Sequence, residues 1–289
     1  MRALLTNDDG IDSPGLHELA RQVEAAGFEV VVVAPSFDAS GTGASLGHIS
    51  RERPIHYEKR QIAGLKGDAF ALDGPPALCT ITSHLGAFGR RPDVVISGPN
   101  LGLNTGRSVL HSGTVGAALA AQNFGIKGLA VSLAVSDPWH FDTACQYTVD
   151  LLGPLMEAPD RCVLNLNVPA LPFSETLGLR WGGLAEFGSV RSQIVDQAEG
   201  KLFFDLVETA YDPPRDSDLG LVNAGFAALT ALHLKLRCRV TPVMATPSLS
   251  NAFTCASAAH ADSPPKPLAC AAAPGASPLG IERHDNILL

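Results

Sequence analysis

The chain has 289 residues, of which 46% are hydrophobic and 17% are charged, as in a globular protein with a sizeable core. Its formal net charge is -8, and its 21 Lys and Arg residues are too few for a surface that wraps a nucleic-acid duplex. Any phosphate group must therefore be bound locally, by backbone amides, a helix N-terminus or a metal ion that offsets the repulsion.

The amino-terminal segment runs from a short apolar stretch straight into acidic residues (MRALLTNDDG), and it lacks the cleavage site of a secretory signal. No run reaches the ~18 apolar residues of a membrane span. The six cysteines are widely spaced and form neither a CxxC pair nor a zinc-type group. These features predict a cytoplasmic protein that does not contact a membrane.

Strand and helix alternate from the start of the chain. Residues 2–6 form a short apolar run that is typical of a strand buried in a parallel sheet. A helix is predicted next, with Ser13 as its N-cap and Pro14 at its first position, and Gly27 ends it. Residues 28–34 (FEVVVVA) then predict a second buried strand. This is the βαβ pattern of a parallel sheet.

The same alternation returns in the middle of the chain. Strands are predicted at 93–97, 128–133 and 162–168, and helices at 115–124 and 141–156. The pattern indicates an α/β fold with a Rossmann-like, doubly wound and mostly parallel sheet, in which ligands bind beyond the carboxyl ends of the strands. We expect three loops at that edge: TNDDG, PSFDASGTG and SGPNLGLNTG.

The carboxyl-terminal part has a different composition. Gly- and Pro-punctuated strands and turns continue to about residue 236, which we take as the end of the main domain, 1–236. Residues 241–278 are rich in Ala, Ser, Thr and Pro and carry almost no charge. The segment 237–289 is therefore predicted to be a disordered or loosely attached tail. A partly helical arm that packs on a neighbouring subunit is the alternative.

Asp8 and Asp9 are the first candidate functional residues. Two adjacent carboxylates at a strand end repel each other unless a cation lies beside them, and the turn at Gly10 lets both aim at one point. Such hard oxygen ligands suit Mg²⁺ or Mn²⁺ and leave room for water and a substrate phosphate. The alternative is a solvated turn with Asp9-Gly10 at its tip.

The second and third loops offer neutral oxygen and nitrogen atoms. Ser40 precedes Gly41-Thr42-Gly43, where its hydroxyl could complete a metal shell or contact phosphate, although such a sequence also suits a simple flexible loop. Asn100 could supply an oxygen to the metal without adding repulsion to the aspartates. Asn104 could donate hydrogen bonds to phosphate oxygens.

Ser112, Gly113 and Thr114 open an apolar helix directly after the third loop. A glycine lets backbone amides approach an anion closely, and a helix N-terminus adds its partial positive charge. The two hydroxyl groups could bind phosphate, or they could cap the helix. Arg107 and His111 are the nearby groups that can carry a positive charge or move a proton, and a peripheral role suits each of them better.

Four strings in this order resemble the SurE family of survival-protein nucleotidases: LLTNDDGIDSPG, APSFDASGTG, SGPNLGLNTG and VLHSGTVGAALA. The resemblance is strong over residues 1–133 and looser through LNLNVP (164–169) and LVNAGFAALTAL (221–232). It implies a Rossmann-like domain with a smaller carboxyl-terminal part that forms a homodimer or homotetramer. Pro99, Arg107-Ser108 and His111 depart from the family pattern.

The resemblance also implies a function. Family members are metal-dependent phosphatases that hydrolyse nucleoside 5′- and 3′-monophosphates, which makes such nucleotides the expected substrates and one Mg²⁺ or Mn²⁺ per subunit the expected cofactor. The implied metal ligands are Asp8, Asp9, Ser40 and Asn100, with the two aspartates as catalytic residues, and the residues implied around the phosphate are Asn104, Ser112, Gly113 and Thr114. Two rival readings stay open: an aspartyl-phosphate phosphatase, and a non-catalytic nucleotide-binding or assembly protein.

Overall fold

The computed structural model describes residues 1–232. Its main feature is a nine-stranded sheet in the order β3-β4-β2-β1-β5-β6-β7-β11-β8, parallel except at the β3/β4 and β7/β11 pairs. The predicted doubly wound, mostly parallel sheet is therefore confirmed. Its strands are β1 (Arg2–Thr6), β2 (Glu29–Pro35), β3 (Tyr57–Arg60), β4 (Asp68–Leu72), β5 (Val94–Leu101), β6 (Lys127–Leu133), β7 (Val163–Val168), β8 (Leu179–Trp181) and β11 (Ala227–Leu232).

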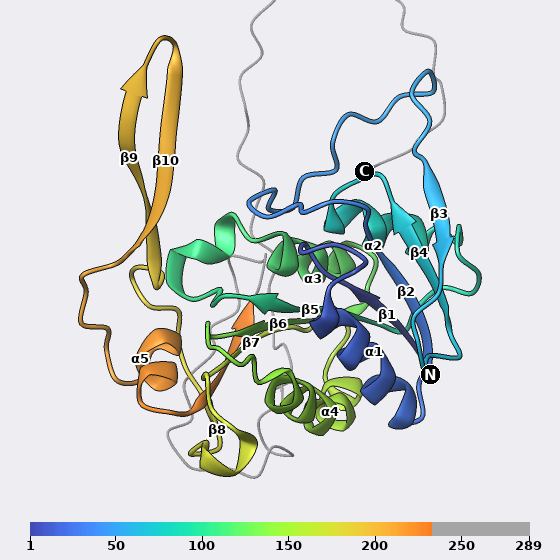
Figure 1. The fold of residues 1–289 in the computed structure, drawn as a ribbon. Coiled ribbons are helices and arrows are strands. Elements are labelled where there is room, and N and C mark those ends of the chain that lie inside the picture. The colour runs from blue at the N-terminus through green and yellow to red at the C-terminus, as the bar shows by residue number, and fades with distance from the viewer. Residues whose placement is uncertain (233–289) are drawn as a thin grey trace, which may run out of the picture. The chain divides into compact units, whose positions relative to one another are not determined.

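Helices cover both faces of this sheet (Figure 1). Helices α1 (Pro14–Ala25) and α4 (Phe141–Glu157) pack on one face, and α2 (Pro76–His84) and α3 (Gly113–Asn123) pack on the other. Because successive side chains of a strand point to opposite faces, Leu5 of β1 enters the core below α1, whereas Leu4 enters the core with α2. The shorter helical elements are the 3₁₀ turns η1 (Gly106–Leu110) and η2 (Phe173–Glu175), and helix α5 (Asp218–Asn223).

Most predicted elements are present, with two corrections. The strand predicted at 93–97 continues as β5 to Leu101, because one inserted residue in a bulge lets pairing with β6 resume at Asn100. Ser13 precedes α1 in an extended conformation, but its side chain makes no capping hydrogen bond. The segment that contains β3, β4 and α2 was not predicted. The expected domain end at 236 and the tail 237–289 lie outside the described residues.

A two-stranded hairpin stands apart from the main sheet. It pairs β9 (Val190–Ala198) with β10 (Lys201–Glu208), and Figure 1 shows it projecting away from the helices and strands of the body. Every residue of β9 is exposed. Several of the exposed side chains are large and apolar, namely Ile194, Val195, Leu202, Phe203, Phe204 and Leu206.

The described chain has no helix that is both long enough and apolar enough to cross a membrane. Three of the cysteines lie in this part, and all three are free thiols: Cys79, Cys145 and Cys162. Complete burial raises the pKa of the Cys79 thiol to about 12. The remaining cysteines lie outside the described residues.

Candidate metal and phosphate site

Three loops meet at the carboxyl edge of the sheet. The strand order reverses at β1, which has β2 on one side and β5 on the other, and ligands bind at such a switch point. The second loop (36–43) contacts the first, since Ala39 N–H donates to the Asp8 carbonyl at 2.8 Å. It also contacts the third (102–111), since Gly43 N–H donates to the His111 carbonyl at 3.0 Å. The loops predicted to form the site are thus joined by backbone hydrogen bonds.

Asp8 is buried against the N-terminus of α3. Its carboxylate accepts hydrogen bonds from both the backbone N–H (3.0 Å) and the hydroxyl (2.5 Å) of Thr114. A side chain at Gly113 would place its Cβ 2.8 Å from the Asp8 Cβ, so only glycine permits this approach. Burial raises the pKa of Asp8 overall, and the Thr114 hydrogen bonds offset part of that rise. Together with the helix dipole, they favour the ionised carboxylate.

Asp9 is less well compensated, because the backbone hydrogen bond from Leu101 that lowers its pKa is a smaller effect than burial and the neighbouring acids. Its Oδ2 atom is buried without a hydrogen-bond partner in the described chain. Burial, followed by the negative charges of Asp8 and Asp38, raises the pKa of Asp9 to about 7. A carboxylate in this state requires either a proton or a nearby cation. This donor set therefore fits a divalent cation, which would restore the charge balance.

The turn that carries the two aspartates is closed by a different residue. The Asn7 side chain accepts from Gly10 N–H at 3.2 Å and donates to the Gly10 carbonyl at 3.0 Å, and Gly10 has a φ of 102° that favours glycine. Since Asn7 holds the turn and Asp8 is only 3% exposed, the alternative of a solvated turn built on these aspartates is wrong for Asp8.

Asn100 lies beside the Thr114 hydroxyl. Its amide nitrogen donates to the Gly102 carbonyl at 2.7 Å, and its oxygen lies 3.4 Å from the Thr114 hydroxyl, whose single proton makes the shorter hydrogen bond to Asp8. The amide oxygen is thereby turned toward the Thr114 hydroxyl that also binds Asp8. The bulge in β5 is what brings Asn100 into this position.

Ser40 lies at the exposed side of the same edge. Its backbone N–H donates to the Asp38 carboxylate at 2.9 Å. Asp38 was not among the residues predicted for the site. It lies two residues before Ser40, in the loop that follows β2. Among residues 1–232, no group of three or more His, Cys, Asp or Glu side chains is placed to hold a metal ion. The predicted ligand set contains only two acids, so it does not depend on such a group.

The predicted phosphate-binding residues at α3 already have partners. Ser112 is the N-cap, and its Oγ accepts from Val115 N–H at 3.1 Å, which confirms the capping alternative. Both donors of Thr114 are directed at Asp8. None of these hydrogen bonds shows whether Ser112, Gly113 or Thr114 binds phosphate. That role stays a prediction.

Asn104 is held by side chains that sequence reasoning missed. Its backbone N–H donates to Asn167 Oδ1 at 2.8 Å, and its carbonyl accepts from Asn165 at 2.8 Å and from Asn167 at 3.1 Å. Its own amide nitrogen donates to the Ser132 hydroxyl at 2.8 Å. The signal was present in LNLNVP, because two asparagines at i and i+2 of a buried strand share one face and need hydrogen-bond partners there.

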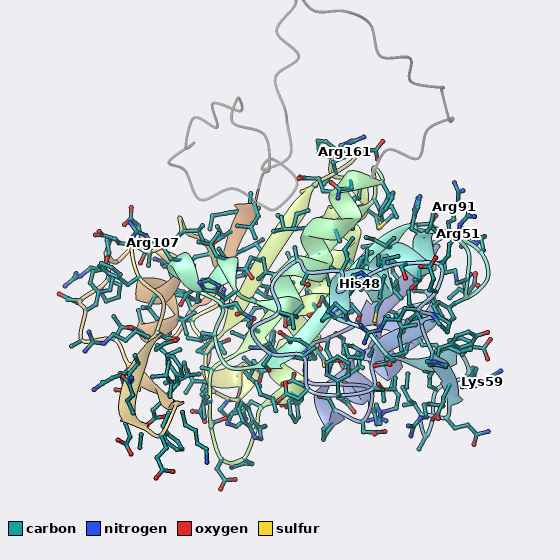
Figure 2. The ribbon with its side chains drawn as sticks, turned by 90° about the horizontal axis from the view of Figure 1, so that it is seen from above. His48, Arg51, Lys59, Arg91, Arg107 and Arg161 are labelled. Atoms are coloured by element: carbon teal, nitrogen blue, oxygen red, sulfur yellow. The ribbon has the colours of Figure 1, made fainter. Side chains whose placement is uncertain are left out.

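Cationic side chains are spread over the surface of the molecule. Figure 2 shows the labelled Arg51, Lys59, Arg91 and Arg161 at the rim of the molecule. Arg107 is also exposed, and its guanidinium lies 5.6 Å from the centre of the Phe187 ring. The charges that act on Asp9 are those of other acids, so the pair keeps its need for a cation.

Comparisons with known proteins agree with the geometry. The family model of survival protein SurE matches residues 3–189. The 5′/3′-nucleotidase SurE of Cronobacter sakazakii is 36% identical over 87% of this chain and 98% of its own length. The 5′-nucleotidase SurE of Rubrobacter xylanophilus is 40% identical over 62% of this chain and 70% of its own length. The crystal structure of the SurE protein from Aquifex aeolicus has a TM-score of 0.67 and 30% identity, covering 82% of this chain and 95% of that one.

Proposed function

The chain belongs to the SurE survival-protein family, and from that membership we propose that it is a 5′/3′-nucleotidase, which hydrolyses nucleoside monophosphates to nucleoside and phosphate. The observation that carries the proposal is the pair of buried Asp8 and half-buried Asp9, which lies where the strand order reverses and next to the N-terminus of α3. One acid of the pair is hydrogen-bonded by the helix, and the other has a buried oxygen without a partner.

We propose one Mg²⁺ or Mn²⁺ per subunit, held by Asp8, Asp9, Ser40 and Asn100. The pKa of Asp9 near 7, its unpartnered oxygen and the amide oxygen of Asn100 all support a hard cation at this point. When bound, such an ion polarises a phosphate ester and lowers the pKa of a coordinated water.

The residues of the chain orient the reacting groups. Thr114 fixes the rotamer of Asp8 through two hydrogen bonds, and Gly102 fixes the amide of Asn100. The α3 N-terminus at Ser112 and Gly113 supplies partial positive charge for the phosphate oxygens. The amide nitrogen of Asn104 donates to Ser132 and has a second N–H, which we propose as a donor to phosphate. Binding is therefore local, as the net charge of -8 requires.

Assembly and location complete the proposal. The exposed apolar side chains of the β9–β10 hairpin support a homodimer or homotetramer, since such a surface is usually covered by another protein. The free thiols Cys79, Cys145 and Cys162 suit the reducing cytoplasm, where disulfides are rare.

The direct test measures phosphate release from AMP and GMP with Mg²⁺ or Mn²⁺, for the wild-type protein and Asp8→Asn. We expect release by the wild type and a large loss in the variant. Equal rates in both proteins would remove the proposed role of Asp8. Metal-dependent nucleotide binding without turnover would support the non-catalytic alternative, and a phospho-aspartate trapped by mass spectrometry would support the aspartyl-phosphate mechanism.

A further inference from the structure

Asp218 is a fully buried carboxylate surrounded by backbone N–H groups of three chain segments. Its Oδ2 accepts from Gly106 at 2.9 Å. Its Oδ1 accepts from Ala185 and from Leu219, both at 2.8 Å. The residue thus joins the third loop, the segment that leads into β9, and the start of α5, although these lie far apart in the sequence.

Two of these segments, the third loop and the segment that leads into β9, cross each other in close contact. An added Cβ at Gly106, where φ is 53°, would lie 2.3 Å from the Phe187 carbonyl oxygen. An added Cβ at Gly188 would lie 2.9 Å from the Ser108 Cβ. The hydrogen bonds of Asp218 therefore act at a tight crossing, where the position of one segment sets the position of the other.

This crossing is continuous with the candidate site. Gly106 begins η1, which ends at Leu110, and Ser112 follows as the N-cap of α3. Thr114, two residues further, holds Asp8 with both of its donors. At the other end of the loop, Asn104 is fixed by Asn167. A shift at Gly106 therefore moves the segment that runs from one predicted phosphate-binding residue to the next.

We propose that Asp218 is a positioning residue for the third loop, which sets the loop's place relative to the substrate phosphate through its hydrogen bond to Gly106. The proposal rests on the proposed nucleotidase function. Asp218 is distant from the reacting atoms in sequence and acts through the loop, so it is not a catalytic residue. A carboxylate suits this position because it can accept hydrogen bonds from all three N–H groups at once.

The variant Asp218→Asn should remove the hydrogen bond to Gly106 and keep the other two. Its single amide oxygen can keep the place of Oδ1 and accept from Ala185 and Leu219. Its NH₂ group then faces the Gly106 N–H, where a donor meets a donor and the hydrogen bond is lost. The change therefore removes the link to the third loop and leaves the start of α5 bonded.

Ser217→Ala is the matched control. Ser217 is the neighbouring buried residue and caps the same helix by accepting from Gly220 N–H at 3.1 Å, without a bond to Gly106. Both variants should lower the melting temperature. Only Asp218→Asn should raise KM for AMP, by about tenfold with little change in kcat, because the loop binds phosphate in the ground and transition states alike. An equal rise of KM in both variants, or in neither, would overturn the proposal.

Hydrogen–deuterium exchange supplies a readout that does not need activity. We expect faster amide exchange over residues 105–110 in Asp218→Asn than in the wild type, and wild-type exchange there in Ser217→Ala. Unchanged exchange in Asp218→Asn would overturn the positioning role. If the wild type itself released no phosphate from AMP, the proposed function would fail, whereas the exchange comparison would still test the link to Gly106.

Discussion

At the carboxyl edge of the sheet, acidic side chains require a positive charge beside them. On the β9–β10 hairpin, exposed apolar side chains require a surface that covers them. The edge buries an Asp9 oxygen without a hydrogen-bond partner, and burial together with neighbouring acids raises the pKa of Asp9. The hairpin instead exposes large apolar side chains such as Phe204 and Leu206, which are 62% and 66% exposed. Each region lacks a different kind of partner.

Under the proposed function, these two requirements are met from different sources. The acid pair needs a small cation that can enter the protein, whereas an exposed apolar strand pair needs another protein surface. Substitutions at the edge should therefore abolish activity and leave assembly unchanged. Substitutions on the hairpin should do the reverse.

The largest effect is expected from Asp9→Asn. The variant removes the charge that the proposed ion requires, so kcat for AMP should fall by more than ~100-fold, above the loss typical of residues that only support a metal ligand. Steady-state phosphate release checks this. Asp12→Asn is the control, because it removes an exposed acid four residues from Asp8 and should leave kcat unchanged. A wild-type kcat in Asp9→Asn would contradict the electrostatic account of the edge.

A smaller loss is expected from Thr114→Val. The substitution removes the hydroxyl that donates to Asp8 and lies beside the Asn100 oxygen, and it keeps the backbone N–H, so kcat/KM should fall by about tenfold. Thr148→Val is the control, since Thr148 is a buried threonine of α4 that bonds only the Ala144 carbonyl. If both variants kept wild-type kcat/KM, Thr114 would have no part in orienting Asp8.

The pH dependence of metal binding sharpens the comparison further. The pKa of Asp9 is about 7 in the folded protein and 3.8 ordinarily, so the ion-free fold holds this proton more tightly than the unfolded chain does. The Asp9 contribution to stability is therefore present at low pH and is lost as pH rises through about 7. Because the ion competes with the proton, the rise in melting temperature caused by Mn²⁺ should grow between about pH 5.5 and 7.5.

Thermal melts with and without Mn²⁺ at several pH values check this prediction. In Asp9→Asn the Mn²⁺-induced shift should be small and should not change with pH across this range. A wild-type shift of constant size from acid to neutral pH would mean that Asp9 does not exchange its proton for the ion.

The smallest effect on activity is expected from Ile194→Asp on the hairpin. Ile194 is 53% exposed and pairs with Phe204 across the strands, so a charge there should disfavour an apolar interface and reduce the molar mass in light scattering. The kcat/KM should stay within about twofold of wild type. Leu85→Asp, at an exposed apolar residue outside the hairpin, is the control and should leave the mass unchanged. An unchanged mass in Ile194→Asp would exclude this face from assembly.

Sequence patterns predicted the elements that carry long apolar runs. The predicted strand at residues 2–6 matches β1, and the helix that begins at Pro14 matches α1, because buried parallel strands and Pro-initiated helices have strong local signals. The segment with β3 was missed, since its residues YEKR are all exposed and have no apolar face. Its strand exists because of pairing with β4, which is a long-range effect.

The site was predictable where it depends on loop chemistry. Asp8, Thr114 and Asn100 are neighbours on one edge, as the strand-end rule suggested. The contribution of Asp218 could not be predicted from spacing, because it acts across contacts between segments that lie far apart in the chain. The spacing of the two asparagines in LNLNVP did indicate a shared buried face, but not that Asn104 is their partner. The ligand roles of Ser40 and of the phosphate-binding residues stay predictions.

The most direct test of the central claim is phosphate release from AMP by wild-type protein that has been stripped of divalent ions with EDTA and then titrated with Mn²⁺. The account predicts that stripping abolishes release, that Mn²⁺ restores it, and that Mn²⁺ does not restore it in Asp9→Asn. Release that continues at full rate in the stripped protein would contradict the claim that the acid pair works through a cation.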